Sequence, residues 1–432
     1  MVRPSDRCQD IAELRSGSAG QGTVRFHVGT ISLCNKETKK VEKVLKAGVI
    51  GVGILGRWHS KFLHDHPNTR LVAVADTIEE RAKAESEKYG ARAYKDYAQM
   101  LQQEKLDLVV VATPDPFHRD PVVAAAQAGV PYIVTEKPMA TTVADAKAML
   151  EATKKAGAKL WVNLNNRVGP MDRATRYVIQ NGLIGKPVYG EVRVDDNIVV
   201  PTQMWGNRSK EWASGSSTAQ FLFSHVTDLM RWYFQPAEVT KVYAVSKREV
   251  LGYTPDLFDG FLFFDSGLLL RIKSEWIKHI EGLVEFYECF SGDQGIIIYN
   301  KIPGFGVQHS WRANLSREVT EQELMKHHRA LGERGISARA VMYNEDPYVA
   351  TLPVEGGPQR RAALEMYPSS RPHPDLMKYI LDAILEGKDI PSSWEGNGPL
   401  PTGEDGLVQT KMVCAIERSA ELGREVTIAE ME

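Results

Sequence analysis

The chain has 432 residues, of which 43% are hydrophobic and 25% charged, and its formal net charge is −2. This length exceeds the size at which a single hydrophobic core stops growing, so we expect two domains. The near-neutral charge argues against a nucleic-acid partner, and no stretch approaches the roughly 20 apolar residues of a membrane-spanning helix.

Residues 1–45 carry no helical or dinucleotide-binding signature, and we expect an arm or an added edge strand there. Residues 23–34 are rich in β-branched and aromatic side chains, which is typical of a strand. The charged start lacks the apolar run of a signal peptide, which indicates a cytoplasmic protein. The four cysteines are scattered without a close pair, so we expect free thiols and no metal site.

Residues 46–166 alternate short apolar runs with amphipathic segments. We expect strands at 47–50, 71–75, 108–111, 132–135 and 160–164, and helices at 79–89, 120–128 and 143–156. Continuous apolar strands that alternate with helices predict a parallel sheet covered on both faces. The predicted fold class is therefore α/β, with an N-terminal Rossmann domain.

Residues 167–432 change to many strand-like segments and predict an α+β domain with a large, mostly antiparallel open sheet. The clearest hairpin joins 261–264 to 268–272, and a second turn joins 283–290 to 296–299. We expect helices at 171–180, 374–386 and 404–422, the last packing near the Rossmann domain, and loops or irregular insertions over 301–372. One face of such a sheet is free for substrate or for a second subunit, so we expect a homo-oligomer, a dimer or higher.

A glycine-rich turn follows the first predicted strand. Gly51, Gly53 and Gly56 have the dinucleotide-binding spacing, with Ile54 and Leu55 between the last two. The first glycine permits a tight turn, the second lets a pyrophosphate approach the backbone, and the third allows helix and strand to pack closely. Because free amides at a helix start attract anions, we expect these five residues to bind a dinucleotide, although a mere glycine-rich turn is the alternative.

Asp76 ends the second predicted strand, twenty residues after Gly56. A carboxylate there accepts hydrogen bonds from the adenosine ribose and repels a 2′-phosphate, which favours NAD over NADP. Two alternatives stay open: Arg81 can accommodate a 2′-phosphate, and Asp76 can serve as the N-cap of a helix over 78–89.

Two later segments also follow predicted strands of the parallel sheet. Thr113, Pro114 and His118 come after one strand, and Glu136 and Lys137 come after the next. Ligands of open parallel sheets bind beyond the carboxyl ends of the strands, so we expect these residues to border the cofactor. Burial beside a cationic nicotinamide would lower the pKa of Lys137 towards neutrality, as suits a proton donor and acceptor. The alternative is a surface lysine paired with Glu136.

A third segment has helical periodicity, which places His225, Asp228 and Trp232 on one face. A histidine with a carboxylate one turn away to orient it suits a general base. The alternative is a core histidine held by a local hydrogen bond.

These segments together resemble the glucose-fructose oxidoreductase and inositol dehydrogenase family, called Gfo/Idh/MocA. The resemblance runs from about Lys46 to the end, without much of 301–372, through the motifs GVGILG, VADT, ATPDPFH, TEKPMA, SHVTDLMRW and DGLVQTKMVCAIERSAELGREVTI. It implies that Lys137 is a catalytic lysine that also meets the nicotinamide and that His225 is the substrate-side acid or base. It further implies that Asn165 and Arg167 lie near the nicotinamide and substrate.

One position departs from the pattern of many sugar and cyclitol dehydrogenases of this family. They place an aspartate four residues before the histidine, where this chain has Phe221. Asp228 is retained and can hold the ring. An aromatic substrate portion, such as a glycoside aglycone, would suit Phe221, Phe223 and Trp205, although such residues also serve in packing.

The sequence thus predicts an NAD-dependent oxidoreductase that transfers hydride between the nicotinamide and a ring carbon of a sugar, sugar derivative, glycoside or cyclitol. The hydroxyl proton would pass to Lys137 or His225. The main alternative is a hydrolase or lyase that uses NAD for transient oxidation and elimination of an aglycone, as glycosidases of the family do. A non-catalytic NAD-dependent regulator is a third reading.

Overall fold

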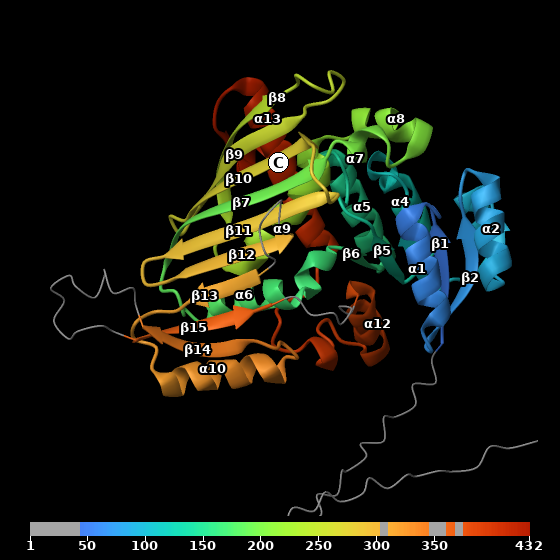
Figure 1. Cartoon of the computed structure of the whole chain (residues 1–432). Helices are drawn as coiled ribbons and strands as arrows, with labels where there is room; N and C mark the ends of the chain where they lie inside the picture. Colours follow the sequence, from blue (N-terminus) through green and yellow to red (C-terminus); the bar gives the residue numbers. More distant parts are fainter. Residues whose placement is uncertain (1–43, 303–309, 345–359, 368–374) are drawn as a thin grey trace, which may run out of the picture. The chain divides into compact units, whose positions relative to one another are not determined.

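The computed structural model describes residues 44–302, 310–344, 360–367 and 375–432 (Figure 1). Residues 1–43 of the predicted arm, with its strand at 23–34, lie outside these ranges. None of the described helices combines the length and the apolar composition that crossing a membrane requires.

Six parallel strands form the first sheet, in the order β3-β2-β1-β4-β5-β6, which confirms the predicted Rossmann fold. The strands are β1 (Leu45–Ile50), β2 (Thr69–Ala75), β3 (Arg92–Tyr94), β4 (Leu108–Val111), β5 (Tyr132–Thr135) and β6 (Lys159–Val162). The connecting helices are α1 (Ile54–Asp65), α2 (Glu79–Tyr89), α3 (Tyr97–Gln103), α4 (Arg119–Gln127) and α5 (Val143–Ala156). The chain order reverses at β1 and β4, so the loops after these strands meet at the switch point where such sheets bind ligands.

Ten strands form the second sheet, in the order β14-β15-β13-β12-β11-β7-β10-β9-β8-β16. They are β7 (Pro187–Asn197), β8 (Val239–Lys247), β9 (Leu257–Phe264), β10 (Leu269–Lys278), β11 (Val284–Gly292), β12 (Ile296–Ile302), β13 (Ser310–Asn314), β14 (Arg339–Asn344), β15 (Arg360–Met366) and β16 (Val426–Thr427). Neighbours are antiparallel except β7 and β10, which confirms the mostly antiparallel sheet. Burial alternates along β9 and β10, because helices cover one face.

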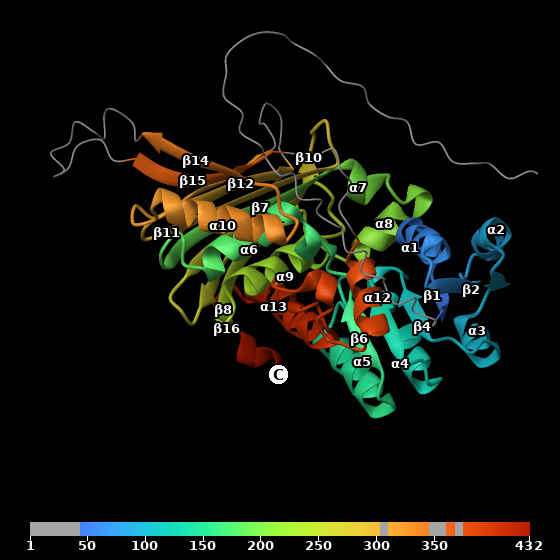
Figure 2. The same cartoon turned by 90° about the horizontal axis from the view of Figure 1, so that it is seen from below.

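The helices on that face are α6 (Pro170–Gln180), α9 (Ser224–Phe234) and α13 (Gly403–Leu422) (Figure 2). Short helices α7 (Val199–Thr202) and α8 (Ser209–Ser214) follow β7, and α12 (Leu376–Glu386) precedes α13. α13 contacts β8 of the second sheet and also β6 and α5 of the Rossmann domain. At Gly406 a Cβ atom would lie 2.5 Å from Met139 Sδ, so the glycine permits this close packing.

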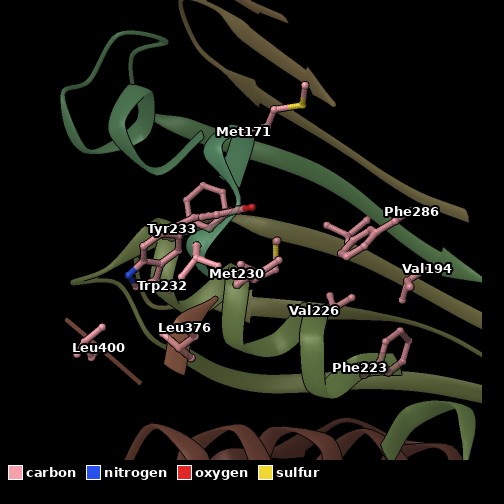
Figure 3. Close-up of a cluster of buried hydrophobic side chains, with 14 of the residues drawn as sticks. Met171, Val194, Phe223, Val226, Met230, Trp232, Tyr233, Phe286, Leu376 and Leu400 are labelled. Atoms are coloured by element: carbon pink, nitrogen blue, oxygen red, sulfur yellow. The ribbon is translucent and has the colours of Figure 1, made fainter. Parts of the chain in front are cut away.

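Phe223 belongs to the core between α9 and the second sheet. It is 0% exposed, and Figure 3 shows it in one apolar cluster with Val226, Met230 and residues of β7 and β11. The expectation that Phe223 lines a substrate pocket is therefore wrong. Trp232, at the other end of α9, is also fully buried in this cluster.

The region 301–372 contains more regular structure than the sequence predicted. Its described parts hold β13, β14, β15 and α10 (Glu321–Glu333). A capping box starts α10, in which Thr320 and Glu323 each bond the other's backbone, while Leu324 and Leu331 are buried. The many charges on its exposed face obscured the few apolar positions that define the helix.

Candidate active site

The glycine-rich turn lies between β1 and α1. Gly51 has a φ of +84°, and a Cβ atom there would lie 2.6 Å from the Ala112 carbonyl oxygen after β4. A Cβ atom at Gly56 would lie only 1.8 Å from the Gly51 carbonyl oxygen. Both positions therefore exclude larger residues, because the turn passes close to the neighbouring strand and helix.

Gly53 differs from the other two glycines, since a Cβ atom there would meet no atom within 4 Å. It is the N-cap of α1 and offers no side chain to the first amides of the helix. Ile54 and Leu55 in that first turn are 51% and 43% exposed. Open space in front of uncapped amides fits the pyrophosphate of a dinucleotide.

Asp76 follows β2 directly and lies beside this turn. Its Oδ2 accepts a hydrogen bond from the Val52 amide at 2.9 Å, and its Oδ1 accepts one from the Ile78 amide at 2.8 Å. The N-cap of α2 is Ile78, so the alternative that Asp76 caps this helix is wrong. The two bonds fix the carboxylate, and each oxygen retains a lone pair for a ribose hydroxyl.

Thr113, Pro114 and His118 lie in the loop after β4. The His118 ring is buried, with Nδ1 2.8 Å from the Pro138 carbonyl oxygen and Nε2 2.8 Å from the Thr113 carbonyl oxygen. Thr113 Oγ1 donates to the Phe117 carbonyl at 2.8 Å. Because both ring nitrogens face carbonyls, His118 ties the loop after β4 to the loop after β5. The side chain is 1% exposed and presents almost no surface to a ligand.

Glu136 is buried at the end of β5. It accepts hydrogen bonds from His59 of α1 at 2.7 Å and from Asn163 Nδ2 at 2.8 Å. Burial alone would raise the pKa of Glu136, but these bonds and the charge of Lys137 keep it below its ordinary value. Glu136 is therefore ionised and connects the end of β5 with His59 and Asn163.

Lys137 is 8% exposed, so the alternative of a surface lysine paired with Glu136 is wrong. Its Nζ donates to the Phe221 carbonyl at 3.1 Å and lies 3.9 Å from the centre of the Phe221 ring. Burial lowers the pKa of Lys137, and the negative charges of Asp115, Glu136 and Asp196 offset this only partly. A lowered pKa favours the neutral amine, which can accept a proton from a substrate.

His225 lies at the start of α9. Its Nδ1 is 3.0 Å from Asn166 Nδ2, whereas no hydrogen bond to Nε2 occurs among the described residues. Burial and then the charge of Lys137 hold the pKa of His225 well below its usual range, so the ring is neutral at pH 7. Asn165, by contrast, uses its Oδ1 to accept a bond from the Leu376 amide.

Arg167 and Asp228 form a fully buried ion pair. Arg167 Nε lies 2.9 Å and Nη2 2.5 Å from the two oxygens of Asp228, with Asp405 3.6 Å away. Arg167 is 0% exposed, so it cannot touch a ligand. The expectation that it contacts the cofactor is therefore wrong. Asp228 faces Arg167 and not His225, so the expectation that it orients the ring is also corrected.

Phe221, which lies beside Lys137, belongs to a cluster of four aromatic side chains. The Trp212 ring lies 5.0 Å from Phe221, 5.4 Å from Trp276 and 5.2 Å from Trp205. Trp205 is partly buried, and its indole nitrogen has no hydrogen-bond partner in the part of the chain that the structure describes. Phe221 and Trp205 are thus placed as expected for an apolar wall, although packing among the rings accounts for part of it.

Several residues of this site were missed in the sequence: His59, Asn163, Asn166, Asp196, Trp212 and Trp276. His59 left a weak signal, because it falls on the buried face of α1 together with Gly56, Ser60 and Leu63. The others come from elements whose neighbours only the fold determines.

Comparison with known proteins gives the family. A profile described as an oxidoreductase family with an NAD-binding Rossmann fold matches residues 45–164, and a GFO/IDH/MocA C-terminal domain profile matches residues 173–297. The two together cover more than half of the chain.

The chain is 35% identical over 213 residues to a D-apiose dehydrogenase of Paraburkholderia graminis, covering 49% of this chain and 55% of that protein. It is 33% identical over 144 residues to a myo-inositol 2-dehydrogenase of Thermotoga maritima, covering 33% and 43%. The matches thus span about half the length of these relatives. A crystal structure of a probable dehydrogenase from Thermotoga maritima shares the fold, with a TM-score of 0.64 and 24% identity over 90% of this chain and 100% of that one. The chain therefore belongs to the Gfo/Idh/MocA family of oxidoreductases with an NAD-binding Rossmann fold.

Proposed function

We propose that the protein transfers a hydride between NAD and a ring carbon of a sugar, sugar derivative, glycoside or cyclitol. The observation that carries this proposal is the buried Lys137 amine at the carboxyl edge of the parallel sheet, next to His225 of the second sheet's helix layer. Relatives named D-apiose dehydrogenase and myo-inositol 2-dehydrogenase support the substrate class.

Separate residues would bind the cofactor and move the proton. When bound, NAD supplies a hydride acceptor at C4 of its nicotinamide. Gly51, Gly53 and Gly56 would hold its pyrophosphate and Asp76 its ribose. Lys137 takes the hydroxyl proton of the substrate.

His225 has a separate part in this proposal. Because the Asn166 amide nitrogen faces Nδ1, the proton of a neutral ring sits on Nε2, which can donate a hydrogen bond to the substrate oxygen. The aromatic rings around Phe221 exclude water and strengthen these polar contacts.

The test is to incubate the purified protein and NAD with a panel of sugars, cyclitols and aryl glycosides while NADH and free aglycone are followed together. Accumulation of NADH supports the dehydrogenase. Release of aglycone without net NADH supports the redox-neutral hydrolase or lyase, which the apolar wall at Phe221 and Trp212 favours. If no compound of the panel gives NADH or free aglycone, both proposed activities are contradicted.

Asp76→Ala is expected to relax the preference for NAD. Loss of a charged acceptor for the ribose should weaken NAD binding about tenfold, while removal of the repulsion leaves NADP binding equal or tighter. Titration of both dinucleotides with Asp76→Ala and the isosteric Asp76→Asn gives the four dissociation constants. Unaltered affinities in both variants contradict the assignment.

We also propose a cytoplasmic homo-oligomer that associates through the face of the ten-stranded sheet opposite α6, α9 and α13. Cross-strand neighbours make a row of mixed charge there, including Arg271 with Asp259 and Arg312 with Glu365. Such a surface can pair with a second copy of itself about a two-fold axis. Light scattering after size-exclusion chromatography measures the mass, and a monomer contradicts this part of the proposal.

A further inference from the structure

Asp196 is a buried carboxylate on β7 that the predicted chemistry does not use. It is 4% exposed, and the alternation of a strand places it on the opposite face from its neighbour Asp195. Asp195 pairs with Lys273 and Lys278, each at 2.9 Å. Asp196 instead accepts one hydrogen bond, from Trp276 Nε1 at 3.2 Å. It therefore has a neutral donor but no ion-pair partner among the described residues.

Side-chain contacts connect Asp196 with the Lys137 amine. The Trp276 ring that binds Asp196 lies 6.1 Å from the Phe221 ring. The Phe221 ring lies 3.9 Å from Lys137 Nζ, and its carbonyl accepts from the same nitrogen. All these groups are partly or fully buried, so the charges of Asp196 and Lys137 act on each other through a medium that screens weakly.

Two other acids, Glu136 and Asp115, also act on the charge of Lys137. Glu136 is held by His59 and Asn163, and Asp115 accepts from Ser216 Oγ at 3.0 Å. No carboxylate of the described residues forms an ion pair with Lys137 Nζ. Asp115 and Asp196 thus each have one neutral donor, and Asp196 is the one that the Trp276 and Phe221 rings connect with Lys137.

The Asp196 carboxyl can gain or lose its proton near neutral pH. Burial and, to a smaller extent, the charge of Asp195 raise the pKa of Asp196, whereas Lys137 and the Trp276 hydrogen bond lower it, and together they bring it to about 7. Near neutral pH the carboxyl can thus change its charge as the charge of Lys137 changes.

We propose that Asp196 is a positioning residue that balances the charge of Lys137 during the reaction. The inference rests on the proposed function. The C–H bond of the substrate breaks and its hydrogen passes as hydride to NAD⁺, while a C=O bond forms. The hydroxyl proton moves at the same time to the neutral Lys137 amine. The ammonium so formed is stabilised by the Asp196 carboxylate.

The kinetic test uses Asp196→Asn with a substrate found in the panel. Oxidation requires a neutral amine at Lys137, and loss of the nearby negative charge lowers the pKa of that amine. The acid limb of the kcat profile should therefore move to lower pH. The plateau should fall about tenfold because the ammonium loses its counter-charge, with KM nearly unchanged. Asp196→Glu should restore part of the plateau.

The matched control is Asp389→Asn, which removes an exposed acid paired with Lys159 at 2.8 Å. Its profile should match that of the unaltered protein. A profile of Asp196→Asn that keeps both its acid limb and its plateau overturns the proposal.

A second measurement needs no substrate. Carbon-13 in the aspartate carboxyl groups allows an NMR titration, in which the signal absent from Asp196→Asn belongs to Asp196. This signal should have a midpoint near pH 7, and Lys137→Met should raise that midpoint because a positive charge is lost. A midpoint that Lys137→Met leaves unchanged overturns the pairing even if the enzyme is active. Coupled titration with no turnover on any substrate overturns the proposed function instead.

Discussion

Lys137→Ala is expected to lower kcat by about 10³-fold while NAD affinity changes by less than about tenfold. Burial lowers the pKa of this amine, which favours its neutral form, the form that can accept a proton. Its hydrogen bond to the Phe221 carbonyl and its position over the Phe221 ring hold it in place. Alanine removes the proton acceptor but leaves the glycine turn and Asp76 intact, so binding should survive where turnover fails.

The measurement pairs steady-state kinetics on a substrate from the panel with NAD titration by calorimetry. Lys155→Ala is the control, because Lys155 is exposed on α5 and belongs to the same domain fold. Turnover by Lys137→Ala at the rate of this control would remove Lys137 from the mechanism.

The parts of the site that directly follow predicted strands were predictable. The glycine turn, Asp76 and Lys137 each follow a strand of the parallel sheet, and that class of sheet fixes where the ends of its strands meet. Once the strands were recognised, these residues could be assigned to the same edge of the sheet. This is why these positions agreed with the sequence pattern, while their roles as ligands of NAD stay predictions.

The contacts made across the fold were not predictable. Helical periodicity placed Asp228 and His225 on one face of α9, but it does not reveal what packs against that face. The partner of Asp228 turned out to be Arg167, 61 positions earlier in the chain. Asp196 and Trp276 meet because β7 and β10 are neighbours in the sheet, an order that hairpin signals alone do not give.

Asp228→Ala is expected to lower the free energy of unfolding by about 3–5 kcal/mol. The Arg167 guanidinium is 0% exposed and would lose two of its hydrogen-bond acceptors without access to water. Asp405 offers partial relief at 3.6 Å, but it already pairs with Arg231 at 2.6 Å. Urea unfolding at pH 7.5, followed by tryptophan fluorescence, should show a lower midpoint with an unchanged slope.

A paired replacement separates the stabilising role from the catalytic one. Removing both charges in Arg167→Met with Asp228→Leu should recover most of the lost stability, since apolar pairs of similar volume often match a buried ion pair. If Asp228 oriented His225 instead, Asp228→Asn would shift the pH profile of kcat with little loss of stability. The structure predicts the opposite for Asp228→Asn, a large loss of stability with little shift of the pH profile of kcat. The reason is that the carboxylate faces Arg167, while the His225 ring is held by Asn166.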